Sequence, residues 1–157
     1  MTGAGAYDAA ALEERLHAVI PLTGAMGITV TRLDAAGIRL EAPLEPNVNH
    51  QGTAFGGSLA ALAMTAGWGL LVSRAAADGL RANWVVRHAE IHFQRPTEGA
   101  LVAECDAPGT AAWAAFRERF AQAGRARAVV EPRVLDAGGV VAVRFRCEYV
   151  ALTPSPP

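Results

Sequence analysis

The stretch Pro46–Leu71, "PNVNHQGTAFGGSLAALAMTAGWGLL", decides the fold. It begins as a polar segment spaced by glycines and continues as an alanine-rich apolar run, with no charged residue between His50 and Arg74. The apolar run predicts a helix over about 56–77, preceded by a loop over 45–53. Such a helix is long enough to raise the question of a membrane span. Its glycines and small polar residues favour a buried core helix, which needs cover on all sides.

The rest of the chain supplies that cover as strands. "MGITVTRLD" and "IRLEAPL" alternate and predict a hairpin through a turn at 35–37. Further strands are predicted over 83–96, 101–107, 125–136 and 140–152, and Pro132 predicts an edge or a bulge within the third of these. Short helices are predicted over 8–19, capped by Asp8 and ended by Pro21, and over 111–124, ended by Gly124. Strands joined mostly by tight turns predict an antiparallel sheet curved around one long helix, an α+β domain.

Composition fits one domain over 1–157, with its first helix inside 1–19 and a disordered tail at 153–157. Hydrophobic residues make up 52% of the 157 residues, an excess that predicts self-association. A net charge of −1 gives no electrostatic footprint for nucleic acid. Cys105 and Cys147 lack metal-ligand spacing, and the first residues do not form a signal peptide, so we expect free thiols and a cytoplasmic protein.

A long helix entered through "GTAFGGS…GWG" and followed by "IHFQRP" resembles the hot-dog fold of acyl-thioester enzymes. Within that superfamily, residues 20–152 look like the thioesterase family of the YiiD C-terminal domain. The resemblance implies thioesters of coenzyme A or acyl carrier protein as substrates and no cofactor or metal. It also implies a homodimer or a dimer of dimers, with sites where the helix start of one subunit meets the other.

Thioester hydrolysis places negative charge on the carbonyl oxygen, and a backbone N–H at a helix start stabilises it. By similarity to better-studied hot-dog thioesterases, Gly56 takes the oxyanion-donor position and Gly57 lets the thioester arm pass. Tight helix–sheet packing is the alternative explanation for both glycines. Those enzymes carry an Asp or Glu eight residues after the first glycine, where this chain has Met64, and often a His where it has Phe55. Their general-base mechanism therefore does not transfer intact.

Polar residues near the helix start are the remaining candidates. Asn49 matches a loop position that carries Asn or Gln in those thioesterases and is expected to hold the carbonyl or the water. His50 beside it is the candidate base, because imidazole titrates in the required range. Both are assigned as catalytic together with Gly56. The expected substrate-binding residues are Thr53, Phe55, Gly57, Ser58, Thr65 and Trp68. Thr65 and Trp68 have structural alternatives, as a hydroxyl bonded to the helix backbone and as core.

Two other classes of function stay open. A non-catalytic protein that binds acyl thioesters is favoured by the missing helix carboxylate, whereas a hydratase would need an Asp–His pair that is not evident. The strand over 83–96 alternates, with Arg87, Ile91 and Phe93 expected on the face toward the helix. His88, Glu90 and His92 share its other face, where a wet surface or a subunit contact explains them better than a metal site. Candidates for contacting phosphates are Arg74, Arg81, Arg95 and Arg125.

Overall fold

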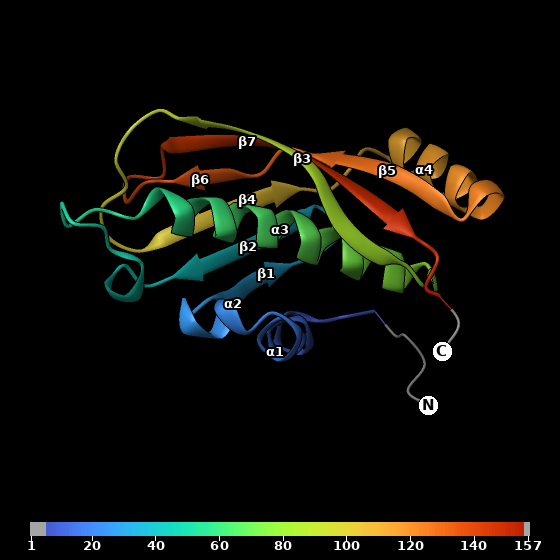
Figure 1. The fold of residues 1–157 in the computed structure, drawn as a ribbon, viewed down its shortest axis with the longest axis horizontal. Helices are drawn as coiled ribbons and strands as arrows, with labels where there is room; N and C mark the ends of the chain where they lie inside the picture. The colour runs from blue at the N-terminus through green and yellow to red at the C-terminus, as the bar shows by residue number, and fades with distance from the viewer. Residues whose placement is uncertain (1–5, 156–157) are drawn as a thin grey trace.

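The computed structural model describes residues 6–155 and places one long helix, α3 (Gly56–Ala77), against a curved sheet of seven antiparallel strands (Figure 1). The strands are β1 (Thr29–Leu33), β2 (Gly37–Ala42), β3 (Asn83–Phe93), β4 (Leu101–Asp106), β5 (Arg125–Val130), β6 (Arg133–Leu135) and β7 (Val141–Leu152). The other helices are α1 (Ala9–Val19), α2 (Pro21–Ala25), α4 (Thr110–Ala123) and the 3₁₀ helix η1 (Glu45–Asn47). The sheet order is β1-β2-β4-β6-β7-β3, with β5 also paired to β7. The predicted α+β class is confirmed.

Helix ends largely fall where the sequence places them. Asp8 caps α1, its Oδ1 accepting the Ala11 N–H at 2.8 Å. Gly79 and Gly124 follow α3 and α4 with φ of +69° and +64°, a conformation that glycine adopts without steric cost. The interpretation of Pro21 as a stop was incomplete, because Pro21 also starts α2, where its missing N–H costs nothing.

The predicted strand over 125–136 is divided. Pro132 cannot donate to a ladder, so the chain leaves regular pairing at Glu131–Pro132 and resumes as β6. Both pieces pair with β7, and β6 alone also pairs with β4. The expected tail begins with Thr153 held by Gly124, whose carbonyl accepts the Thr153 N–H at 2.8 Å. Residues 1–5 and 156–157 lie outside the described part of the chain.

Helix α3 is the core of the domain. It has the length and composition of a membrane span, but 67% of its most apolar window is buried inside the fold. Two glycines let neighbours approach it closely. A Cβ on Gly67 would lie 2.8 Å from the Tyr149 hydroxyl, and one on Gly69 would lie 3.3 Å from methyl groups of Ile38 and Leu12. Tyr149 is fully buried, and its hydroxyl donates to the Met64 carbonyl at 2.5 Å.

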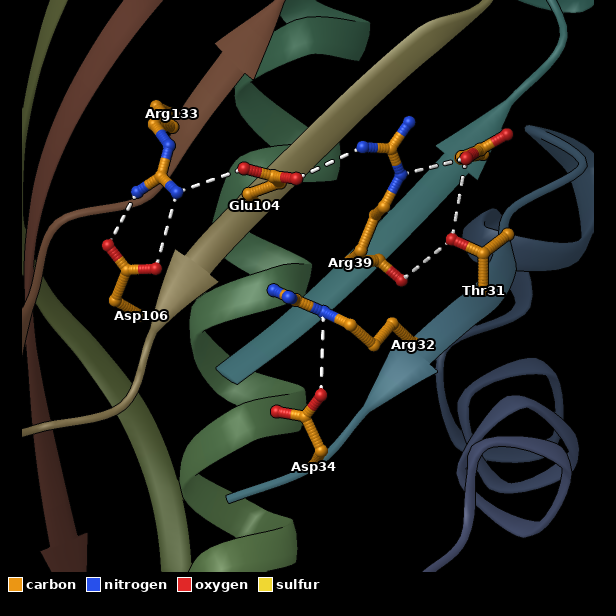
Figure 2. Close-up of polar contacts among 8 residues, drawn as sticks. Thr31, Arg32, Asp34, Arg39, Glu104, Asp106 and Arg133 are labelled. Carbon is orange, nitrogen blue, oxygen red and sulfur yellow. Dashed lines mark hydrogen bonds and ion pairs between the residues drawn. The ribbon is translucent and has the colours of Figure 1, made fainter. Parts of the chain in front are cut away.

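The outer face of the sheet carries a chain of ion pairs from β6 to β2 (Figure 2). Arg133 binds Asp106 at 2.7 Å and Glu104 at 2.9 Å. Glu104 in turn binds Arg39 at 3.0 Å, and Arg39 binds Glu41 at 2.9 Å. The hydrogen bond from Arg133 holds the pKa of Asp106 below its ordinary value. A face covered by charges faces water, so the apolar side of the sheet and the core lie against α3.

Strand β3 lies at an edge of the sheet and departs from the simple alternation predicted for it. The pairing with β7 shifts register between Val86 and His88, which leaves Arg87 in a bulge. Ala89 and Ile91 are half-buried against the core as expected. Arg87 was expected on that face but is half-exposed, with Nη1 2.6 Å from Glu148 Oε1. The bulge is the physical reason for the difference.

Candidate functional site

The start of α3 has unused hydrogen-bond donors. Phe55 occupies the cap position in an extended conformation, with φ −66° and ψ 130°, and no side chain caps the helix. The first intrahelical bond from this end runs from the Leu59 N–H to the Phe55 carbonyl at 3.0 Å. The N–H groups of Gly56, Gly57 and Ser58 precede it, and first-turn donors have no intrahelical acceptor. The 22-residue helix adds its dipole at this point.

The loop before the helix is fixed by two asparagines. Asn47 is 1% exposed, and its Nδ2 donates to the carbonyls of Met26 and Pro43. Asn49 folds the loop on itself, since its Oδ1 accepts the N–H groups of Gln51 at 2.8 Å and Thr53 at 3.2 Å. Its Nδ2 donates to Thr53 Oγ1 at 2.9 Å and to the Ala54 carbonyl at 3.3 Å. Both the oxygen and the nitrogen of the Asn49 amide are therefore engaged in hydrogen bonds within the loop.

A cavity of about 380 Å³ opens at the helix start. It lies between the loop, the first turn of α3 and the segment that follows β3. Its lining residues are Asn49, Gln51, Thr53, Ala54, Gly56, Leu59, Phe93, Gln94, Arg95, Pro96 and Thr97. The lining thus brings together three of the predicted site residues, Asn49, Thr53 and Gly56. It contains a guanidinium but no carboxylate or imidazole from this subunit.

Two aromatic rings flank the glycine pair. A Cβ on Gly56 would meet the Phe93 ring at 3.4 Å, which is ordinary contact. A Cβ on Gly57 would collide with the ring of Phe55. The space beside Gly57 is thus filled by the side chain of Phe55, two residues earlier, rather than left open for a thioester arm. Both rings are more than half exposed, at 55% for Phe55 and 56% for Phe93, so this end of the helix presents apolar surface to solvent.

The other predicted site residues lie outside the cavity lining. His50 is exposed at the tip of the loop, and Ser58 is half-buried in the first turn. Thr65 is buried at 9% exposure and follows Gly56 by nine residues, about 14 Å along the helix. Trp68 packs against the core a further turn away. Met64, at the position of the missing carboxylate, is likewise half-buried against the core.

Sequence reasoning missed the segment after β3 as a wall of the cavity. Thr97 is fully buried, and its carbonyl accepts the Ala54 N–H at 2.8 Å, which joins this segment to the loop. Its Oγ1 has no hydrogen-bond partner. Gln94 and Arg95 lie on the same wall, and Arg95 is 3.5 Å from Asp136. The motif "IHFQRP" contains Gln94 and Arg95 of this wall, but only the pairing of β3 in the sheet places the end of that strand beside Gly56.

The row His88, Glu90 and His92 does not form a cluster of three ligands. His92 Nε2 lies 3.2 Å from Glu90 Oε1, whereas His88 is paired in register with Glu148 across to β7. Within residues 6–155, no group of three His, Cys, Asp or Glu side chains is placed to hold a metal ion. Of the arginines considered for phosphates, Arg74 donates to the Pro108 carbonyl at 2.9 Å and lies over the Trp113 ring.

Comparisons with known proteins agree with this architecture. The family model described as "Putative thioesterase (yiiD_Cterm)" matches residues 9–153. No curated protein matches the chain. Among solved structures, the protein OLEI01261 from Chlorobaculum tepidum TLS, of unknown function, is 29% identical, with a TM-score of 0.90. The match covers 93% of this chain and 94% of that chain.

Two further solved structures share the fold at lower identity. A thioesterase from Shewanella oneidensis, described as putative, is 23% identical, with 92% of this chain and 96% of that chain covered and a TM-score of 0.79. A probable thioesterase from Pseudomonas aeruginosa, also described as of unknown function, is 21% identical with a TM-score of 0.81. That match covers 97% of this chain and all of the other. The hot-dog architecture expected from the sequence is confirmed.

Proposed function

The chain belongs to the thioesterase family of the YiiD C-terminal domain, and on that premise we propose that it hydrolyses acyl thioesters at the start of α3. The observation that carries the proposal is the uncapped first turn of a 22-residue helix opening onto a cavity that Gly56 lines. Free N–H donors at the positive end of a helix dipole suit an oxygen that becomes negative during the reaction.

In the proposed reaction, water adds to the thioester carbonyl carbon and the carbonyl oxygen becomes an oxyanion held by the Gly56 N–H. The carbon–sulfur bond then breaks. The thiolate takes the proton that the water gives up, so a carboxylic acid and a thiol are released. One donor of this kind commonly contributes a factor of about 10² to 10³ in kcat.

The roles of the loop residues follow from their contacts. Asn49 fixes the loop, because both ends of its amide are hydrogen-bonded within it. Thr53 Oγ1 accepts one of these hydrogen bonds, and Thr53 is part of the cavity lining. His50 is the candidate base on this loop, and it is exposed beside the cavity lining of its own subunit. Phe55 and Phe93 offer an apolar surface for the acyl chain.

We include a homodimer in the proposal, formed by β3 of two copies. β3 has 11 residues, lies at the sheet edge and exposes Val85 at 48%, Val86 at 45% and Phe93 at 56%. An exposed edge of this length is a template for pairing with another strand. Antiparallel pairing about the middle of β3 would set the Asn83 end of one copy beside the Phe93 end of the other, and hence beside its Gly56. Sedimentation equilibrium should give twice the mass of the chain. A monomer at micromolar concentration would refute the proposed homodimer.

The N–H of Gly56 can be removed without disturbing the helix. Proline is favoured at the first helical position and lacks an N–H. Phe55, with ψ 130°, is already in the extended region that a residue before proline prefers. A Cβ at Gly56 has ordinary contacts, so Gly56→Ala is a matched control that adds the carbon and keeps the donor. Thiol release from acyl thioesters of graded chain length gives the activity, and thermal unfolding checks the fold.

We expect Gly56→Pro to lower kcat by about 10² or more while Gly56→Ala keeps most of it. Equal activity of Gly56→Pro and wild type would remove the oxyanion role. The alternative is a protein that binds acyl thioesters without cleaving them, which the lack of a carboxylate or imidazole in the cavity lining favours. Saturable binding by wild type with no thiol released would decide for that alternative.

A further inference from the structure

Three arginines meet at the end of the molecule opposite Gly56. A pocket of about 400 Å³ is lined by Arg119 of α4 and by Arg125, Ala126 and Arg127 of β5. In Figure 1, α4 lies at the end of the molecule away from the Gly56 start of α3, and β5 runs from there back along the far half of that helix. The lining contains three guanidinium groups and no carboxylate.

Local structure brings these arginines together. In "RARA", side chains alternate, so Ala126 is buried while Arg125 and Arg127 share the exposed face. α4 buries Trp113, Phe116 and Phe120, which leaves Arg119 outside. Gly124, in the left-handed conformation, turns the chain directly from α4 into β5. Arg119 therefore lies beside the strand that carries the other two.

The cluster is short of negative charge. Its nearest ion-pair partner among the described residues is Glu148, 3.5 Å from Arg127. That carboxylate is already 2.6 Å from Arg87 on the other side of β7. Within residues 6–155, neither Arg119 nor Arg125 lies within 4 Å of a carboxylate oxygen. Several guanidinium groups in one pocket match the charge and geometry of phosphate oxygens, which they can bind in pairs.

The position suits a long substrate. Arg125 is opposite Leu152, which is opposite Asn83, so the cluster is two strand spacings, about 10 Å, from the Asn83 end of β3. In the β3-paired dimer, that end lies beside the helix start of the other subunit. A pantetheine arm separates the thioester from the phosphates of coenzyme A, so a phosphate site belongs at a distance from the reacting carbonyl.

We propose that Arg119, Arg125 and Arg127 bind the phosphates of a coenzyme A thioester whose acyl group is held at the helix start of the other subunit. This assignment rests on the proposed dimeric thioesterase. It selects coenzyme A over acyl carrier protein as the acyl carrier, and it ranks Arg125 above Arg74, Arg81 and Arg95 for phosphate contact.

The test compares R119Q/R125Q with R144Q/R146Q, which removes two exposed arginines from the outer face of β7 and changes the net charge equally. The measurements are the affinity for coenzyme A itself, and kinetics with the same acyl group carried by coenzyme A, by acyl carrier protein and by N-acetylcysteamine. We expect R119Q/R125Q to weaken coenzyme A binding and raise KM for acyl-coenzyme A about tenfold or more. Its kcat/KM on the truncated thioester should equal that of wild type. The R144Q/R146Q control should match wild type throughout.

Unchanged coenzyme A affinity in R119Q/R125Q, or an equal loss in the control, would overturn the assignment. A loss seen only with acyl carrier protein would overturn it in favour of that carrier. Turnover of the truncated thioester without cluster-dependent binding of coenzyme A would support the proposed hydrolysis and overturn the phosphate site. Cluster-dependent binding of coenzyme A without turnover of any thioester would support the phosphate site and overturn the proposed hydrolysis.

Mixed dimers test whether the cluster serves the other subunit. Co-expressing Gly56→Pro chains with R119Q/R125Q chains creates dimers in which one site combines an intact helix start with the intact cluster of its neighbour. We expect such dimers to recover up to half of the wild-type activity at low acyl-coenzyme A. No recovery would show that each subunit uses its own cluster and would overturn the arrangement across subunits.

Discussion

Gly67→Ala is expected to destabilise the domain although alanine is the better helix former. A Cβ at this position would lie 2.8 Å from the Tyr149 hydroxyl, 3.0 Å from a Val130 methyl and 3.1 Å from the Tyr149 ring. The hydroxyl cannot move aside freely, because it is buried and bonded to the Met64 carbonyl of the same helix. The substitution therefore pushes β7 and α3 apart and also breaks that hydrogen bond.

The magnitude follows from three contributions. Overpacking a well-filled core costs about 2 kcal/mol. A lost buried hydrogen bond costs about 1 kcal/mol. Replacing glycine by alanine inside a helix returns about 1 kcal/mol. We therefore expect Gly67→Ala to lower the free energy of unfolding by about 2 kcal/mol.

Gly69→Ala is the matched control, two residues along the same helix. A Cβ there would meet only the ends of the Ile38 and Leu12 side chains at 3.3 Å, which can shift by a few tenths of an ångström. Its packing cost of about 1 kcal/mol should cancel the gain in helix propensity. Urea unfolding at equilibrium measures both variants. The reasoning fails if Gly67→Ala is as stable as Gly69→Ala, or more stable than wild type.

Two further predictions concern thiols and pH. Cys105 and Cys147 are buried, and desolvation raises the pKa of both thiols, that of Cys105 to about 12. We therefore expect neither thiol to react with Ellman's reagent at pH 8 until urea unfolds the protein. Rapid reaction of either thiol in the native protein would contradict their burial. Because Arg133 depresses the pKa of Asp106, the stabilisation from that pair should be complete above an ordinary aspartate pKa of about 4 and lost as the pH falls below it. Asp106→Asn should therefore flatten the fall in urea midpoint between about pH 5 and 3, and a slope unchanged from wild type would show that Asp106 contributes nothing.

The fold was largely predictable because its signals are local. The apolar run after Gly56, the glycines after α3 and α4 and the alternation in most strands each act through neighbouring residues. The features that the sequence could not show depend on pairing between strands that are far apart in the chain. The bulge at Arg87 exists only against β7, and after the division at Pro132 the chain keeps β7 as a partner and gains β4 as a second one.

For the candidate site, the placement of some residues was more predictable than their contacts. Gly56, Asn49 and Thr53 do line one cavity, because the loop and the helix start are continuous in the chain. The commitment of the Asn49 amide to its own loop, and the filling of the space beside Gly57 by Phe55, depend on side-chain conformations that residue type does not determine. The wall formed after β3 depends on sheet pairing between distant segments.

The break at Pro132 also bears on solubility. Among the described residues, β5 pairs only with β7, so its second edge has backbone N–H and C=O groups without a partner strand. α4 lies against this strand, and its Phe116 ring stacks on the Trp84 ring of β3, with 5.2 Å between the ring centroids. Open strand edges are where sheets from different molecules join. A chain without α4 would in addition expose the Trp84 ring that Phe116 covers, so we expect it to aggregate.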